Sequence, residues 1–278
     1  MKALDGIRII NLAVNLPGPA AARRLHQLGG SVVKVEPPAG DPMELYHAAW
    51  YRDMAKGHEV VRLDLKAAEG RARLEELLAE ADLLITASRP AALERLGLDW
   101  PSLHRRFPRL CQVAIVGYPA PRDNEAGHDL TYQASLGLLT PPHMPRTLLA
   151  DMAGAEQTVS AALTLLLARE RGQGGGYAEV ALSEAAAAMA EPLSYGTTAP
   201  GALLGGNLPE YNIYEAKEGW VAVAALEPHF KNRLQELLGI RTIEEYRAAF
   251  ATRSAAVWQE WGQEKDVPIV TVKGPSAC

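Results

Sequence analysis

The chain has 278 residues, and its 28 Lys and Arg residues against 33 Asp and Glu residues give a formal net charge of −5. This balance lacks the basic excess of most nucleic-acid-binding proteins, so we expect no nucleic-acid partner. Hydrophobic residues make up 48% and charged residues 22% of the chain, which is ordinary for a globular protein and excludes a disordered or collagen-like chain.

The longest uncharged apolar stretch of helical character, residues 158–168, ends at Arg169 and is shorter than the roughly 18 to 20 residues that a membrane span needs. Residues 1–5 have no basic region followed by a long apolar run, so they predict no secretory signal. We therefore expect a soluble, cytoplasmic protein without a membrane partner. Its two cysteines, Cys111 and Cys278, supply neither a disulfide framework nor a metal cluster, and we expect no metal.

The first half of the chain alternates apolar runs typical of buried strands with segments of helical periodicity. The predicted strands are 7–14, 31–36, 60–65, 82–86 and 110–116, and the predicted helices between them are 20–28, 67–81 and 90–106. Turn residues such as Pro17-Gly18-Pro19 separate them. Strands that alternate with helices predict an α/β fold with a doubly wound, Rossmann-like parallel sheet built from right-handed βαβ units.

The second half begins with one long predicted helix, 151–171, which a glycine-rich run breaks before a short strand at 177–182. A further helix is predicted at 185–190, and a glycine-containing connector follows at 201–207. Beyond this connector, 211–214 and 220–225 predict a hairpin. We therefore expect a large Rossmann-like domain over residues 1–200 and a small α+β domain over residues 201–278.

Titratable side chains occur where two loops enter helices. His128 and Asp129 stand in the segment Gly-His-Asp-Leu-Thr-Tyr, and Asp151 stands in Leu-Leu-Ala-Asp-Met-Ala-Gly. Either aspartate, taken alone, is explained by helix capping, because Asp is a preferred N-cap residue. His128 has no such preference, and the local sequence leaves a surface histidine and a functional one equally open.

Glu227 is a third candidate. Pro228 suits the first position of a helix, which makes Glu227 the N-cap, although Glu is not among the residues that favour that position. A solvated charge is the simpler interpretation of Glu227 on its own.

Several motifs spread over nearly the whole chain carry a resemblance to a known family. They lie at 4–9, 17–20, 28–38, 40–42, 63–66, 89–98 and 169–174. In these segments the sequence resembles the class III coenzyme A transferases (the CaiB/BaiF-like superfamily) and, most closely, the related 2-methylacyl-CoA racemases.

The resemblance implies an epimerase of 2-methylacyl-CoA thioesters. The racemases place His before the aspartate where the transferases usually place an aromatic residue, and here the pair is His128-Asp129. Asp151 and the segment that contains Glu227 also match the racemases. Moving a proton between two faces of the α-carbon requires two acid–base groups, which the resemblance assigns to His128 and Asp151, with Glu227 orienting His128 or sharing its proton. Backbone N–H groups at the helix starts would stabilise the enolate oxygen.

Two alternatives remain open. In a CoA transferase, Asp129 would attack an acyl-CoA thioester, form a mixed anhydride and pass CoA to a second carboxylate. In a non-catalytic CoA-binding paralogue, CoA would bind without turnover.

The resemblance also assigns substrate contacts. CoA, which is part of the substrate and not a separate cofactor, should bind at the carboxyl ends of the strands. Asn15, Leu16 and Pro17 match the turn on the adenine side, and Arg89 matches a basic position near the pantetheine or phosphate path. Tyr132 and Thr147 are expected at the substrate. Thr147 replaces an asparagine of the racemases, and Pro37 replaces an arginine that they often have.

Family members form homodimers, often interlocked, so we expect a homodimer here. They usually continue well past Val270 with a segment that returns to the large domain, which leads us to expect a shortened C-terminus. The sequence does not identify the acyl group of the substrate, because a branched fatty acyl, an arylpropionyl and a bile-acid side chain are compatible with the same residues.

Overall fold

The computed structural model describes residues 2–274 and divides the chain after Ala190 into two compact units. The division falls before the expected boundary at residue 200. The connector that suggested that boundary is itself folded, because the backbone N–H of Gly201 donates to the Gly205 carbonyl and that of Leu204 to the Thr197 carbonyl, each at 2.9 Å. The second unit therefore begins at Glu191, where helix α10 (Glu191–Ser194) starts after α9 has ended.

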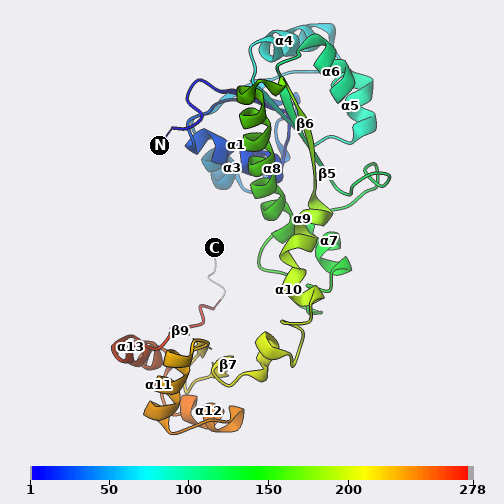
Figure 1. Cartoon of the computed structure of the whole chain (residues 1–278). Helices are drawn as coiled ribbons and strands as arrows, with labels where there is room; N and C mark the ends of the chain where they lie inside the picture. The colour runs from blue at the N-terminus through cyan, green and yellow to red at the C-terminus, as the bar shows by residue number, and fades with distance from the viewer. Residues whose placement is uncertain (1, 275–278) are drawn as a thin grey trace. The chain divides into compact units, whose positions relative to one another are not determined.

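A six-stranded, wholly parallel sheet forms the centre of the first unit (Figure 1). Its strands are β1 (Arg8–Asn11), β2 (Ser31–Glu36), β3 (Glu59–Arg62), β4 (Leu83–Thr86), β5 (Cys111–Val116) and β6 (Tyr177–Ala181). They lie in the order β3-β2-β1-β4-β5-β6. The strand order changes direction between β1 and β4, and open α/β sheets bind ligands at such a switch point. The expected Rossmann-like fold is confirmed.

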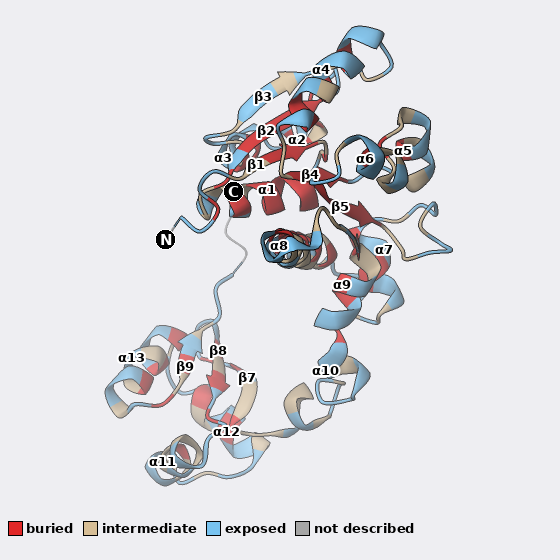
Figure 2. Ribbon diagram, turned by 45° about the horizontal axis from the view of Figure 1, so that its top comes forward, coloured by how far each residue is buried: buried red, intermediate tan, exposed pale blue. Residues whose placement is uncertain are grey.

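Helices cover both faces of this sheet. One face packs against α1 (Pro17–Gln27), α3 (Ala48–Met54) and α8 (Leu149–Ala168), and the other against α4 (Ala68–Ala79), α5 (Pro90–Leu96) and α6 (Trp100–Arg106). Neighbouring strand residues alternate between the faces: Ile9 belongs to the first core and Ile10 to the second. Burial on both faces explains the nearly continuous apolar runs in the sequence, and Figure 2 shows the central strands as buried.

The structure corrects one local prediction and adds two helices. The segment 90–106 is two helices, because Gly97 adopts a left-handed conformation (φ 67°) and ends α5. The segment after β2 contains α2 (Pro42–Tyr46) and α3, because Asp41 caps α2 and the His47 ring accepts a hydrogen bond from the N–H of Trp50 at the start of α3.

The remaining helices of the first unit are α7 (Asp129–Ser135) and α9 (Leu182–Met189). Irregular turns occur at Arg169–Gln173 and, in the second unit, at Leu203–Asn207, where Gly172 and Gly206 have positive φ. None of the helices within the described residues has the length and apolar character that crossing a bilayer requires.

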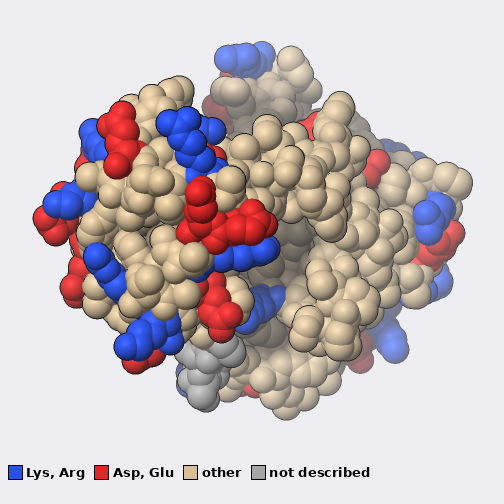
Figure 3. Space-filling model, turned by 90° about the horizontal axis from the view of Figure 1, so that it is seen from below, with Lys and Arg blue, Asp and Glu red and all other residues tan. Residues whose placement is uncertain are grey.

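The second unit is α+β. Its antiparallel sheet contains β7 (Tyr211–Glu215), β8 (Trp220–Ala224) and β9 (Ile269–Thr271), and its helices are α11 (Pro228–Leu238), α12 (Ile243–Phe250) and α13 (Ala255–Lys265). Four stacked or edge-packed aromatic residues fill the core: Tyr214, Tyr246, Phe250 and Trp258. On the face of the molecule that Figure 3 presents, acidic and basic side chains are interspersed.

Candidate active site

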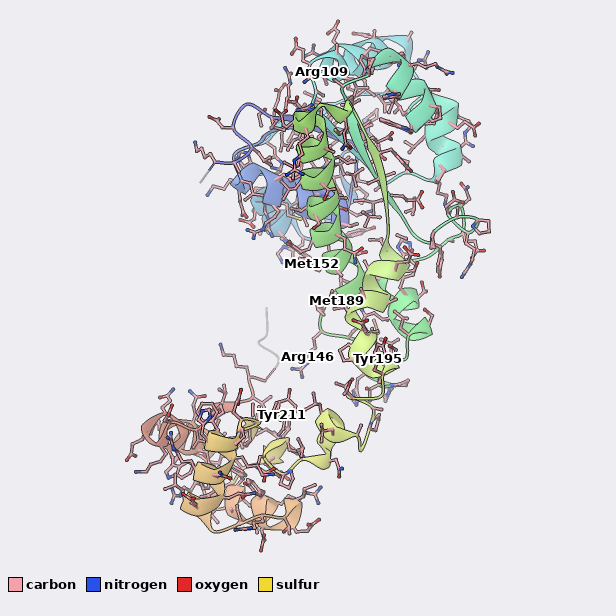
Figure 4. The ribbon with its side chains drawn as sticks, in the orientation of Figure 1. Arg109, Arg146, Met152, Met189, Tyr195 and Tyr211 are labelled. Carbon is pink, nitrogen blue, oxygen red and sulfur yellow. The ribbon has the colours of Figure 1, made fainter. Side chains whose placement is uncertain are left out.

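A cavity of about 300 Å³ opens at the carboxyl ends of β1, β4 and β5, at the switch point of the sheet. In Figure 4, Met152 marks the end of α8 on the cavity side, and Arg109, just before β5, marks the opposite edge of the sheet. Six of the residues assigned from the sequence line the cavity: Asn15, Pro17, Arg89, His128, Tyr132 and Asp151. Residues far apart in the chain therefore share one site.

His128 lies at the start of α7 as its N-cap, so Asp129 is the first residue inside the helix. The backbone N–H of His128 donates to Thr131 Oγ1 at 3.0 Å, and that hydroxyl donates to the His128 carbonyl at 2.8 Å. These bonds form the return half of a capping box, so His128 helps to start α7 as its N-cap residue. His128 is exposed and lines the cavity.

Asp129 is only 4% exposed and does not line the cavity. Its Oδ1 accepts hydrogen bonds from the backbone N–H groups of Ala150 (2.7 Å) and Asp151 (3.2 Å), and its Oδ2 accepts one from Gln133 Nε2 (2.6 Å). The N-cap residue of α8, Leu148, has no side-chain acceptor of its own. Asp129 therefore caps α8, the neighbouring helix, and not α7.

Asp151 is the third residue of α8, so the capping interpretation does not apply to it. Asp151 lines the cavity and is half-buried. Burial, and secondly the negative charge of Asp129, raise the pKa of Asp151 to about 6, while the nearby His128 opposes the shift. At neutral pH Asp151 is thus an ionised carboxylate that is more basic than an ordinary one, as a catalytic base requires.

Tyr132 is 1% exposed and lines the cavity. Two glycines of the lining make room for it: a Cβ at Gly117 or at Gly127 would lie 2.5 Å from the Tyr132 hydroxyl oxygen. Tyr118 packs edge-on against its ring at 5.1 Å between centroids. Burial, followed by Tyr118, Asp151 and Asp129, raises the pKa of Tyr132 to about 12, so the phenol stays protonated and is a fixed hydrogen-bonding group.

The turn between β1 and α1 contributes Asn15, which adopts a positive φ of 65°. Its backbone N–H donates to Asp41 Oδ1 at 2.9 Å. Leu16 is 3% exposed and lies outside the lining, whereas Pro17 begins α1 and lines the cavity. Arg89 is exposed at the N-terminus of α5 and lies in the lining as well.

Thr147 is exposed and is not part of the cavity wall. Its carbonyl accepts a hydrogen bond from Gln133 Nε2 at 3.3 Å, and the same nitrogen donates to Asp129. Thr147 is thus connected to the site through Gln133 and not through its hydroxyl.

A second cavity, of about 540 Å³, is lined mainly by apolar side chains and shares Leu12, Val14 and Ser88 with the first. It lies beside the loop that follows β2 and includes Pro37 and the buried Glu36. Sequence reasoning missed Ser88 and Glu36 as residues of the cavity linings. A signal was present for Glu36, because a Lys and a Glu lie inside an otherwise apolar strand.

Glu227 belongs to the second unit and is the exposed N-cap of α11, with Pro228 following as predicted. Its side chain makes no capping hydrogen bond. Among residues 2–274, no cluster of three or more His, Cys, Asp or Glu side chains is suited to hold a metal ion.

The sequence model of CoA-transferase family III matches residues 4–278. The chain belongs to CoA-transferase family III. Its curated relatives include enzymes of two kinds. The succinyl-CoA–D-citramalate CoA-transferase of Chloroflexus aurantiacus is 27% identical over 263 residues, which cover 86% of this chain and 65% of the relative. The α-methylacyl-CoA racemase of Homo sapiens is 30% identical over 262 residues, which cover 87% of this chain and 66% of the relative. The chain thus spans about two thirds of the length of these relatives.

Solved structures agree on the fold of this CoA-transferase family III protein. The Mycobacterium tuberculosis protein Rv3272 superposes with a TM-score of 0.87 at 24% identity, covering 99% of this chain and 85% of that one. A CAIB/BAIF family protein from Brucella suis gives a TM-score of 0.82 at 24% identity, covering 98% and 84%. Relatives of this CoA-transferase family III chain include both transferases and racemases, so its reaction has to be argued from the site.

Proposed function

We propose that this CoA-transferase family III protein epimerises 2-methylacyl-CoA thioesters by removing and returning the α-proton. One observation carries the proposal: His128 and Asp151, from the first turns of two different helices, line a single cavity at the switch point of the sheet. The raised pKa of Asp151, about 6, supports it, because a more basic carboxylate is a better acceptor for the α-proton.

The reaction needs two groups of comparable basicity. One of the pair takes the α-proton, and the C–H bonding electrons move into an enolate whose negative charge is on the thioester oxygen. The other then gives a proton to the α-carbon from the opposite face, and the roles reverse for the other epimer. The backbone N–H groups of Asp129 and Leu130, the first two residues of α7, would donate to the enolate oxygen.

The matched test is proton NMR of one epimer of a 2-methylacyl-CoA in deuterated water. We expect exchange of the α-proton with loss of stereochemical purity. Epimerisation should be lost in both His128→Ala and Asp151→Asn, and exchange should be lost in the one of them that lacks the base facing the α-proton of the chosen epimer. Two exposed residues outside the cavity lining provide control variants, His143→Ala and Asp53→Asn, which should exchange at the wild-type rate. A folded wild-type protein that exchanges no α-proton would exclude the racemase.

A CoA transferase is the second candidate, and the structure changes which residue it would use. Both oxygens of Asp129 accept hydrogen bonds and hold α8, whereas Asp151 lines the cavity. The attacking carboxylate would thus be that of Asp151. An oxygen of Asp151 would add to the thioester carbonyl carbon, and CoA would leave as the thiolate, which gives a mixed anhydride.

The two candidates differ in their dependence on His128. CoA transfer from an acyl-CoA to an added carboxylate, followed by chromatography of the CoA esters, should be absent if the racemase proposal holds. Transfer that survives His128→Ala and is lost in Asp151→Asn would favour the transferase. CoA binding without exchange or transfer would favour the non-catalytic paralogue.

Three further expectations stay part of this proposal. Glu227→Gln should slow α-proton exchange if Glu227 acts in the same reaction, and the NMR assay measures it. A homodimer is expected, which analytical ultracentrifugation tests. Fractionation of the source cell would test the cytoplasmic location.

A further inference from the structure

Four charged or polar side chains form a buried network beside the cavity without lining its catalytic end. Lys34 and Glu36 lie on β2 and are each 1% exposed, and Asp41, in the following loop, is 2% exposed. Lys34 Nζ lies 2.5 Å from Asp41 Oδ2 and 3.0 Å from Glu36 Oε1. The hydroxyl of Tyr51 donates to the same Glu36 oxygen at 2.7 Å. Buried charges persist only when they are paired in this way.

The network ends on the β1–α1 turn. Asp41 Oδ1 accepts two backbone hydrogen bonds at 2.9 Å, one from Met43, the second residue of α2, and one from Asn15. The hydrogen bond from Asn15 joins the turn after β1 to the loop after β2. It also holds Asn15 at φ 65°, a conformation that costs free energy for any residue with a Cβ and that Asn tolerates better than most.

This turn is the wall that the two cavities share. Leu12 and Val14 line both cavities, and Asn15 lines the catalytic one. The turn is packed so tightly that a Cβ at Gly18 would lie 2.1 Å from the Cβ of Ala13. A change in the Asn15 peptide therefore moves a surface that a long ligand spanning both cavities would contact.

We propose that Asp41, clamped by Lys34, is a positioning residue that holds the Asn15 peptide in its left-handed conformation and so keeps the shared wall in the shape that binds a CoA thioester. The inference rests on the proposed function only for the identity of the ligand. Asp41 is buried outside the lining of the cavity that contains His128 and Asp151. Its effect is on affinity for the CoA portion, and not on proton transfer.

The test measures two quantities in the full chain: hydrogen–deuterium exchange of the peptide that contains the Asn15 amide, without ligand, and the dissociation constant of CoA by calorimetry. Asp41→Ala should expose the Asn15 amide to exchange and weaken CoA binding about tenfold or more, because a hydrogen bond to a charged acceptor is lost. Asp41→Asn retains an acceptor oxygen and should restore amide protection and most of the affinity, although the melting temperature falls because Lys34 loses a charged partner. Asp53→Ala, an exposed carboxylate on α3, is the matched control.

A role of Asp41 that is confined to capping α2 is tested separately. Glycine adopts positive φ without steric cost, so Asp41→Ala/Asn15→Gly should bind CoA more tightly than Asp41→Ala alone. A merely structural role predicts no such rescue. If Asp41→Ala does not fold, CoA binding is measured in Asn15→Pro instead. Proline removes the N–H that donates to Asp41 and excludes a positive φ, so this variant should also bind CoA more weakly.

The inference is overturned by wild-type affinity for CoA in a folded Asp41→Ala or Asn15→Pro, by absence of rescue in the double variant, or by a wild-type protein that does not bind CoA. A wild-type protein that binds CoA without exchanging α-protons overturns the proposed function alone.

Discussion

The carboxylate of Asp129 accepts a hydrogen bond from the backbone N–H of Asp151 at 3.2 Å, and its negative charge contributes to the raised pKa of the Asp151 side chain. One buried residue thus fixes the start of α8 and makes the carboxylate in the cavity more basic. This relationship links the stability of the helix to the chemistry that we propose for it.

Replacing Asp129 should therefore separate these two effects. Asp129→Asn keeps an oxygen that can cap α8 but loses the charge, so the pKa of Asp151 should fall, though only in part, because burial is the larger cause. The acid limb of the pH–rate profile for α-proton exchange should move to lower pH. Asp129→Ala also removes the cap and should lower the free energy of unfolding by about 1 to 2 kcal/mol in urea denaturation. An unmoved acid limb in Asp129→Asn would show that the charge of Asp129 does not influence the reaction.

Asp151 itself should be a source of instability. Its pKa in the folded protein, about 6, lies above its ordinary value of 3.8, so the folded state binds the proton more tightly than the unfolded state, and ionisation at neutral pH disfavours folding. We expect Asp151→Asn to increase the free energy of unfolding at neutral pH by about 1 to 3 kcal/mol while abolishing epimerisation. The gain should shrink as the pH falls through 6 toward 3.8, where the wild-type carboxyl is protonated. A variant less stable than the wild type at neutral pH would contradict this.

His58 should make the protein sensitive to acid. Burial, and secondly His26 and Lys34, lower the pKa of His58 to about 4, and both ring nitrogens are buried without a hydrogen-bond partner among the described residues. The unfolded chain takes up this proton below the ordinary pKa of 6.5, so stability is lost as the pH falls from there toward 4.

We expect His58 to account for about 2 kcal/mol of the loss of unfolding free energy between neutral pH and about pH 5. His58→Leu should remove that share of the pH dependence in urea denaturation, whereas the exposed His143→Leu should leave it unchanged. Equal pH dependence in all three proteins would show that His58 titrates normally.

The close packing of Tyr132 against Gly117 can be tested by a double-mutant cycle. A Cβ at Gly117 would lie 2.5 Å from the Tyr132 hydroxyl oxygen and 3.6 Å from the ring carbon that carries it. Gly117→Ala should thus cost about 1 to 3 kcal/mol of unfolding free energy in the wild-type background and much less when combined with Tyr132→Phe.

Gly127 provides the control for this cycle. A Cβ there would lie 2.5 Å from Tyr132 Cε1 as well as from the hydroxyl oxygen, so removal of the hydroxyl should not rescue Gly127→Ala. Equal rescue at both glycines would contradict the packing described here.

The amino-acid sequence by itself determined the architecture of the first unit. Strands such as β2 and β5 begin and end within a residue of their predicted positions, because burial on both faces of a parallel sheet leaves a continuous apolar run that needs no tertiary information. The local sequence alone left His128 open between a surface and a functional residue and explained Asp151 by capping. The resemblance to a known family singled them out.

Only the tertiary structure decided what the two aspartates do. Asp129 looks like a cap for its own helix, and nothing in the sequence indicates that it caps a helix that begins twenty residues later. The pKa of Asp151 and the tie between Asp41 and Asn15 depend in the same way on partners distant along the chain. Hydrogen bonding and desolvation act through space, so which groups they join is determined by the packing of the folded chain and not by local sequence.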